Sequence, residues 1–175
     1  MTSKTNDFLF AVRDEPVIWI KNPLNVFAQN CEGGVITQGE KILELVPQGR
    51  SPKSQIDEVY DASDSVVLPG LINTHHHFYQ TLTRAYPEAL NKELFPWLKS
   101  LYKVWAHIQP EMLSVSTELA LSELLLSGCT TASDHHYLFP SQLENAIDIQ
   151  VDQAQKLGMR VVLTRGSMSL GEKDG

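Results

Sequence analysis

The sequence predicts an α/β fold in which parallel strands alternate with helices, preceded by a module of short strands. From Val66 onward, short apolar or β-branched runs alternate with segments of helical spacing. A strand, a crossover helix and a second strand normally form a right-handed unit, which makes the two strands parallel. Histidines follow two of these predicted strands, at the ends where parallel α/β folds carry their functional groups.

Composition and charge limit the classes of function. The 175 residues include 42% hydrophobic side chains, enough for the core of one ordinary domain with a small appendage. The net charge of −7, without a cluster of Lys or Arg, disfavours partners such as nucleic acid or an anionic membrane and favours a small-molecule substrate. No apolar run approaches the length of a membrane span or resembles a signal peptide, so a cytoplasmic protein is expected. Cys31 and Cys129 lack C-x-x-C spacing, which argues against a thiolate metal site or a disulfide framework.

Residues 1–66 form the first predicted domain, a β module. Gly39 supplies the positive φ that a tight hairpin turn needs between two of its strands. No group of reactive side chains accompanies these strands. The expected strands are Phe8–Val12, Val17–Ile20, Gly34–Thr37, Lys41–Val46 and short runs at Val59–Tyr60 and Val66–Val67.

Residues 67–175 form the second predicted domain, in which helices and strands alternate. Two or three short helices are expected between Leu82 and Ile108, since prolines interrupt that segment. Pro110 suits the first turn of a longer helix that stops at Gly128, with a predicted apolar stripe along one face. The stripe consists of Leu113, Leu119, Ala120, Leu124 and Leu125. The remaining expected elements are a strand over Cys129–Asp134, a helix capped by Ser141 and ending at Gly158, and a strand over Met159–Thr164.

The stretch Leu68–His77 ends a predicted strand in three consecutive histidines. Strand alternation places His75 and His77 on the same side, about 7 Å apart along the strand, with His76 opposite. Two neutral imidazoles in this arrangement can bind one transition metal, although two ligands are only part of a site. The alternatives are a polar surface turn or an imidazole that is hydrogen-bonded within the core.

Two further strand ends carry reactive residues. The second predicted strand ends in Asp134-His135-His136, and the third ends in Arg165. We expect His135 and His136 to lie behind the metal ligands or at the surface. We expect Arg165 to pair with a carboxylate and Cys129 to be a small buried residue.

The stretch Leu68–His77 resembles the first-strand motif PG(L/F)(I/V)(N/D)xHxH of the amidohydrolase superfamily, and Gly128–Thr131 resembles the G-x-T-T start of that superfamily's second strand. The resemblance covers essentially the whole chain. It is strongest to the cytosine-deaminase and chlorohydrolase branch, and within it to 8-oxoguanine deaminases. It implies a TIM (β/α)8 barrel of the metal-dependent hydrolase type, flanked by a β-sandwich module of which residues 1–66 would be half. Because a complete barrel needs about 250 residues, we expect the barrel to be truncated after about strand three.

The resemblance also implies a function. It predicts a metal-dependent hydrolytic deaminase of an aminopurine or related N-heterocycle, 8-oxoguanine-like, that releases ammonia through a metal-bound hydroxide. His75 and His77 would bind Zn²⁺, with Fe²⁺ as the alternative metal. Gln80 matches a glutamine that contacts the heterocyclic substrate in guanine- and triazine-type relatives. Trp97 loosely matches an aromatic residue that lines the substrate pocket in the same relatives. The alternatives are a capping or solvent-exposed role for Gln80 and a core role for Trp97.

Other family features have no counterpart in the sequence. Relatives take further ligands from strands five, six and eight and a proton-shuttling glutamate after strand five. We therefore expect the 175 residues alone to be inactive, and a homodimer only for a longer protein. The alternative functions are an s-triazine or hydroxyatrazine-type amidohydrolase, a guanine deaminase, or a noncatalytic structural domain. The last is weaker, because an unclosed barrel exposes a long strand edge.

Overall fold

The computed structural model of the protein describes residues 15–167. The chain divides into two compact units between Pro69 and Gly70. This division is close to the predicted boundary after residue 66, and the domain assignment itself stays a prediction. The predicted strand Phe8–Val12 lies outside the described residues.

The N-terminal unit is a small β structure. Its four-stranded sheet has the order β4-β3-β1-β5, in which β1 is antiparallel to β3 and parallel to β5. Gly39 has a φ of 53° in the turn between β3 and β4, which confirms the predicted hairpin. A second, two-stranded sheet joins β2, which was not predicted, to β6. The strands are β1 (Val17–Lys21), β2 (Asn25–Val26), β3 (Gly34–Gln38), β4 (Lys41–Val46), β5 (Glu58–Asp61) and β6 (Val66–Val67).

The second unit contains a three-stranded sheet with the order β7-β8-β9. Both strand pairs are parallel, as predicted. The strands are β7 (Leu71–His76), β8 (Cys129–His136) and β9 (Arg160–Arg165). The helical segments between them are η1 (Phe78–Thr83), η2 (Pro87–Ala89), α1 (Leu94–Trp105), α2 (Pro110–Leu126), η3 (Ser141–Leu143) and α3 (Ala146–Leu157).

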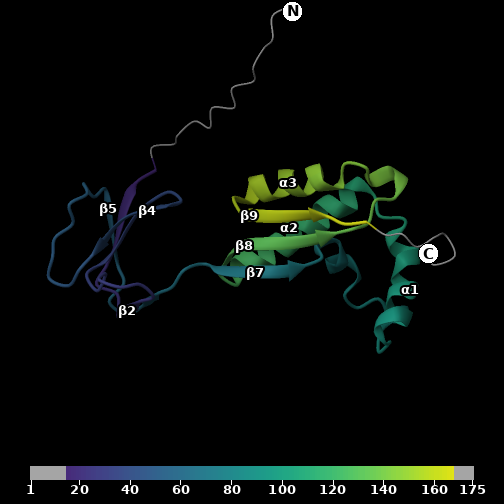
Figure 1. Ribbon diagram of the computed structural model, residues 1–175, viewed down its shortest axis with the longest axis horizontal. Coiled ribbons are helices and arrows are strands. Elements are labelled where there is room, and N and C mark those ends of the chain that lie inside the picture. Colours follow the sequence, from purple (N-terminus) through teal and green to yellow (C-terminus); the bar gives the residue numbers. More distant parts are fainter. Residues whose placement is uncertain (1–14, 168–175) are drawn as a thin grey trace, which may run out of the picture. The chain divides into compact units, whose positions relative to one another are not determined.

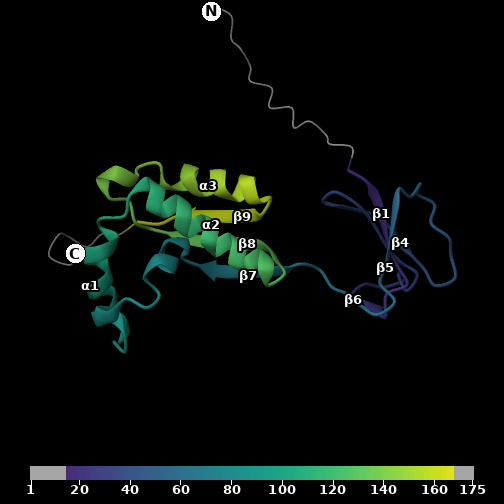
Figure 2. The same cartoon turned by 180° about the vertical axis from the view of Figure 1, so that it is seen from behind.

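Helices α2 and α3 cover one side of this sheet (Figures 1 and 2). The two helices pack on each other, α2 packs on β8, and α3 packs on β9. Between helices and sheet lies an apolar core that includes Phe78, Leu121 and Ala132. In contrast, Ile72 of β7 is 69% exposed and Val162 of β9 is 59% exposed.

The buried side of α2 differs from the predicted stripe. Leu119 is 41% exposed, whereas Ser116 and Thr117 are fully buried. The Ser116 hydroxyl has a local partner, since it donates to the Leu113 carbonyl oxygen at 2.9 Å. The buried Thr117 hydroxyl has no hydrogen-bond partner among the described residues. The short side chains also let η1 approach the helix, as the contacts between α2 and η1 show. The buried residues of α2 are Leu113, Ser116, Thr117, Ala120 and Leu121.

The start of α3 also differs from the prediction. The predicted capping box at Ser141 forms a short 3₁₀ turn, and α3 begins five residues later, at Ala146. The Ser141 hydroxyl donates to Gln142 Oε1 at 3.4 Å. Gln142 in turn donates to the carbonyl oxygens of Ala106 and Ile108, both at 3.0 Å, so tertiary contacts override the local signal. The predicted end at Gly158 is confirmed, with a φ of 69°.

Close approach of two segments explains the Pro-Gly step before β7. A Cβ atom on Gly70 would lie 2.2 Å from Thr130 Oγ1 and 2.4 Å from Thr130 Cγ2. Glycine is therefore required for this segment to run beside the start of β8. No helix within residues 15–167 combines the length and the apolar character that a membrane span needs.

Candidate metal and substrate site

The four residues singled out in the sequence line one cavity of about 510 Å³ in the second unit. His75 is on β7, His77 follows that strand directly, Gln80 is on η1 and Trp97 is on α1. The remaining lining residues are His76, Thr81, Thr83 and Arg84. The structure thus brings the predicted metal and substrate residues together, although what they bind stays a prediction.

The geometry of His75 and His77 suits a shared metal ion. Their ring centres lie 5.1 Å apart, with the ring planes at 88°. Two imidazoles that bind one tetrahedral ion at Zn–N distances of about 2.0–2.1 Å have ring centres about 5 Å apart. The two side chains therefore converge, as the sequence predicts.

A backbone hydrogen bond fixes the tautomer of His77. Its Nδ1 lies 2.7 Å from the carbonyl oxygen of His135. Because a carbonyl can only accept, Nδ1 carries the proton and Nε2 keeps a free lone pair for a metal. Burial lowers the pKa of His77, the neighbouring imidazoles of His75 and His135 lower it further, and the hydrogen bond to the His135 carbonyl opposes the shift without reversing it. The lowered pKa favours the neutral form that binds metals.

His135 lies against the paired imidazoles. Its ring stacks on the ring of His75, with centres 4.7 Å apart and planes at 25°, and its centre is 6.0 Å from that of His77. Within the described residues, no group of three or more His, Cys, Asp or Glu side chains is placed to hold one metal ion. The structure therefore offers a pair of candidate ligands, and a complete site needs further ligands.

His76 packs away from this pair. Its ring centre lies 5.1 Å from that of Phe78, whose side chain is part of the core between the sheet and the helices. Burial lowers the pKa of His76, and the nearby Arg84 guanidinium lowers it further. The His76 side chain is therefore directed away from His75 and His77, as strand alternation predicts.

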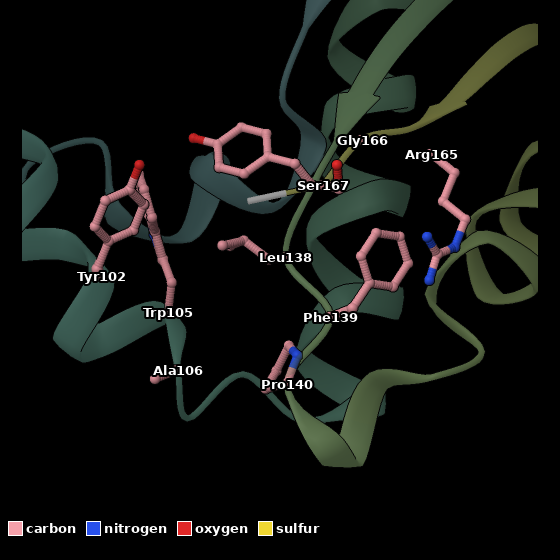
Figure 3. Close-up of a pocket in the computed structure, with 10 residues that line it drawn as sticks. Tyr102, Trp105, Ala106, Leu138, Phe139, Pro140, Arg165, Gly166 and Ser167 are labelled. Atoms are coloured by element: carbon pink, nitrogen blue, oxygen red, sulfur yellow. The ribbon is translucent and has the colours of Figure 1, made fainter. Parts of the chain in front are cut away.

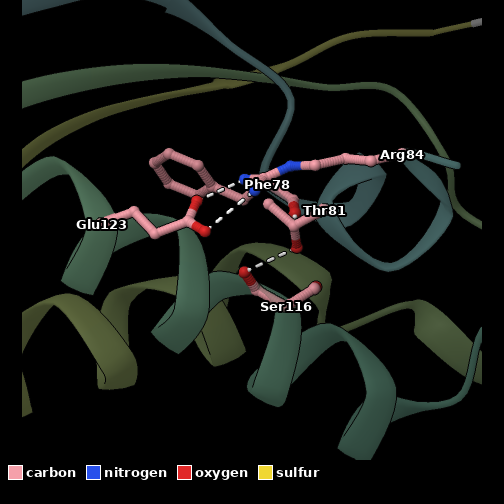
Figure 4. A network of polar contacts seen from close by, with 5 residues as sticks. All are labelled: Phe78, Thr81, Arg84, Ser116 and Glu123. Atoms are coloured by element: carbon pink, nitrogen blue, oxygen red, sulfur yellow. Dashed lines mark hydrogen bonds and ion pairs between the residues drawn. The ribbon is translucent and has the colours of Figure 1, made fainter.

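Polar contacts hold η1, which carries Gln80, against α2 (Figure 4). Arg84 donates from both terminal nitrogens to the two carboxylate oxygens of Glu123. The buried Thr81 hydroxyl lies within hydrogen-bond distance of the Ser116 carbonyl oxygen at 3.1 Å and the Phe78 carbonyl oxygen at 2.9 Å. These contacts fix one wall of the cavity to the helix layer.

Gln80 and Trp97 are anchored to an aromatic cluster. The Gln80 amide donates to the Tyr79 hydroxyl at 3.4 Å. Trp97 packs edge-to-face on the buried Trp105, with ring centres 5.6 Å apart. Trp97 is thus partly a core residue and partly a wall of the cavity, so its two interpretations do not exclude each other. Burial and hydrogen bonding to Tyr137 raise the pKa of Tyr79, which keeps the phenol protonated.

Asp134 is a fully buried carboxylate behind the site. It accepts hydrogen bonds from the Phe78 backbone N–H and from Gln150 Nε2, both at 2.7 Å. Burial raises the pKa of Asp134 to about 6, although these hydrogen bonds oppose the shift. The side chain ties β8 to the segment that directly follows His77.

A second cavity of about 360 Å³ lies at the ends of β8 and β9 (Figure 3). Tyr102 and Trp105 of α1 line it together with Phe139 and Arg165. The Arg165 guanidinium lies 4.2 Å above the Phe139 ring, and it forms no ion pair with a carboxylate among residues 15–167. A carboxylate partner for Arg165 stays a prediction, and among the described residues its guanidinium makes the cation–π contact with Phe139.

Parallel strands carry their functional groups at the carboxyl ends, and two imidazoles at such an end can bind one metal ion. A profile of the amidohydrolase family matches residues 66–175. The chain belongs to this metal-dependent family, and the fold is of the amidohydrolase type. The resemblance expected from the Pro-Gly and histidine motif is confirmed.

Individual relatives agree with this assignment. The chain is 59% identical to 8-oxoguanine deaminase of Pseudomonas aeruginosa over 160 residues, which are 90% of the chain and 36% of the relative. It is 36% identical to hydroxydechloroatrazine ethylaminohydrolase of Pseudomonas sp. (strain ADP), over 75% of the chain and 28% of that relative. The chain thus spans about a third of the length of these relatives.

A solved structure extends the comparison to three dimensions. The chain superposes on atrazine chlorohydrolase of Arthrobacter aurescens TC1 complexed with zinc with a TM-score of 0.76 and 28% identity. The match covers 90% of the chain and 37% of that enzyme.

Proposed function

We propose that the chain is part of a metal-dependent hydrolytic deaminase that acts on an aminopurine or a related N-heterocycle, 8-oxoguanine-like, and releases ammonia. The observation that carries this proposal is the meeting of His75, His77, Gln80 and Trp97 in one cavity. The 59% identity to 8-oxoguanine deaminase supports the same substrate class.

His75 and His77 hold the metal in this proposal. Zn²⁺ is the proposed ion, with Fe²⁺ as the alternative, and the zinc complex of the similar chlorohydrolase supports this choice. A bound divalent ion supplies Lewis-acid chemistry, by which a water becomes nucleophilic at neutral pH. His77 presents Nε2 because its Nδ1–H donates to the His135 carbonyl oxygen. Neither histidine acts as the general acid or base.

Gln80 and Trp97 bind and orient the heterocycle. An amide side chain both donates and accepts, so Gln80 can pair with the polar edge of a purine. The indole of Trp97 offers a flat apolar surface, held in place by Trp105. The cavity volume of about 510 Å³ lies within the range of about 300–1,000 Å³ that small-molecule sites occupy.

We further propose that the protein acts in the cytoplasm on a small molecule, without a nucleic-acid or membrane partner. The net charge of −7 supports this, and both cysteines are free and buried. A homodimer and the assignment of the N-terminal unit to half of a β-sandwich stay predictions from the resemblance.

Ammonia release by the intact protein tests the proposed function. The substrates to compare are 8-oxoguanine, guanine, isocytosine and hydroxylated s-triazines. We expect the highest kcat/KM for 8-oxoguanine, loss of activity with a chelator and recovery with Zn²⁺. A preference for the triazines would establish the triazine alternative instead, and no turnover of any of them would favour the noncatalytic one.

A further inference from the structure

The end of β8 contacts both candidate metal ligands through a single residue, His135. Its carbonyl oxygen accepts the Nδ1–H hydrogen bond of His77 at 2.7 Å. Its imidazole ring stacks on the ring of His75, with centres 4.7 Å apart. The two contacts come from different parts of the residue, so a substitution can remove the second and keep the first.

We infer that His135 is a positioning residue for the metal pair: its ring holds His75 in the orientation that binds metal, and its backbone carbonyl orients His77. This inference rests on the proposed function, because it concerns the same two ligands. It adds a determinant of metal binding on the neighbouring strand, outside the H-x-H motif.

Among the described residues the His75 side chain is exposed, so the ring contacts that it makes there decide its orientation. Within the described residues, the ring contacts of His75 are those with His77 and His135. The backbone hydrogen bond from His75 N to Asn73 Oδ1, at 3.1 Å, leaves the ring free to rotate. The stacked ring of His135 therefore limits the rotamers of His75.

The geometry distinguishes positioning from ligation. A metal binds in the plane of an imidazole, along the nitrogen lone pair. The rings of His75 and His135 are stacked with planes that differ by only 25°, so an ion in the plane of the His75 ring lies outside the plane of the His135 ring, whereas the planes of His75 and His77 cross at 88°. In addition, His135 Nε2 faces the carbonyl oxygen of Thr74 at 3.4 Å.

Two substitutions at His135 separate these roles. His135→Ala removes the stacked ring, whereas His135→Phe keeps a flat ring that cannot bind a metal, and both keep the backbone carbonyl. The Zn²⁺ affinity of the intact protein is measured by competition with a chromophoric chelator. The visible absorption spectrum of the Co²⁺ form reports the ligand geometry. His107→Ala is the matched control, since His107 is exposed on the segment after α1.

We expect His135→Ala to weaken Zn²⁺ binding about 10-fold and to alter the Co²⁺ spectrum. This factor is at the lower end of the losses seen when a residue that orients a metal ligand is removed. His135→Phe should retain both the affinity and the spectrum, and it keeps the test valid if the alanine variant does not fold. Wild-type affinity in a folded His135→Ala variant would overturn the inference. So would a loss in His135→Phe as large as that in His75→Ala, because His135 would then be a ligand. Full metal content in both His75→Ala and His77→Ala would instead refute the proposed metal site.

Discussion

Replacing Asp134 by asparagine is expected to change how the free energy of unfolding depends on pH. The Asp134 side chain is fully buried and its hydrogen-bond partners are uncharged, a backbone N–H and the Gln150 amide. Burial raises its pKa from 3.8 to about 6. A tenfold change in an equilibrium constant is worth about 1.4 kcal/mol, so ionisation of Asp134 in the folded protein costs about 3 kcal/mol.

The sign follows from the direction of the shift. The folded protein holds the Asp134 proton more tightly than the unfolded chain does. The contribution of this group to stability is therefore complete below about pH 3.8 and is lost as the pH rises to above about 6. Asparagine has no such proton, and its amide N–H can donate to Gln150 Oε1, which has no hydrogen-bond partner within residues 15–167.

The assay is urea unfolding of wild type and Asp134→Asn between pH 4 and pH 8. We expect similar stabilities near pH 4 and an advantage for the variant that grows to about 2–3 kcal/mol at pH 8. Asp152→Asn, the same substitution on the exposed side of α3, is the control and should leave the pH dependence unchanged. Parallel stability curves for wild type and Asp134→Asn would refute the assignment of a raised pKa to this carboxyl.

Three further variants test the fold and the site. Gly70→Ala should destabilise the protein by about 1–3 kcal/mol in urea unfolding, because the added Cβ atom would clash with Thr130. Adding Thr130→Ala to this variant should recover part of the loss. Unchanged stability of the Gly70→Ala single variant would contradict the close approach. Gln150→Leu removes a donor to the Asp134 carboxylate and should lower the free energy of unfolding by about 1–3 kcal/mol at pH 8 and by less at pH 4. An equal loss at both pH values would argue against a hydrogen bond that depends on the charge of Asp134. Gln80→Leu should lower kcat/KM about 10- to 100-fold while the Zn²⁺ content stays unchanged; unaltered kinetics would remove Gln80 from the substrate site.

Local chemistry made much of the fold predictable. The start of α2 at Pro110, the end of α3 at Gly158 and the turn at Gly39 depend on backbone preferences that single residues carry. Features decided by tertiary contacts were not predictable in this way. Ser116 is buried because η1 packs on α2, and Gln142 bonds to the end of α1.

In the candidate site, too, local features were predictable from the sequence and tertiary contacts were not. The convergence of His75 and His77 is predictable because strand alternation and a short motif lie within one continuous stretch. The contact of His135 with both of them depends on the register of β8 against β7, which shifts between Asn73 and His76. Periodicity within one strand carries no information on such a shift. The available signal was the position of His135 at the carboxyl end of the neighbouring parallel strand.

Metal content of the intact protein tests the central claim most directly. Elemental analysis compares wild type with His75→Ala, His77→Ala and the exposed control His107→Ala, each purified with Zn²⁺ present. We predict that the His75 and His77 variants each lose most of their bound metal, because each removes one of the paired imidazoles, whereas the control keeps the wild-type content. Wild-type metal content in both the His75 and the His77 variant would contradict the assignment of the metal site.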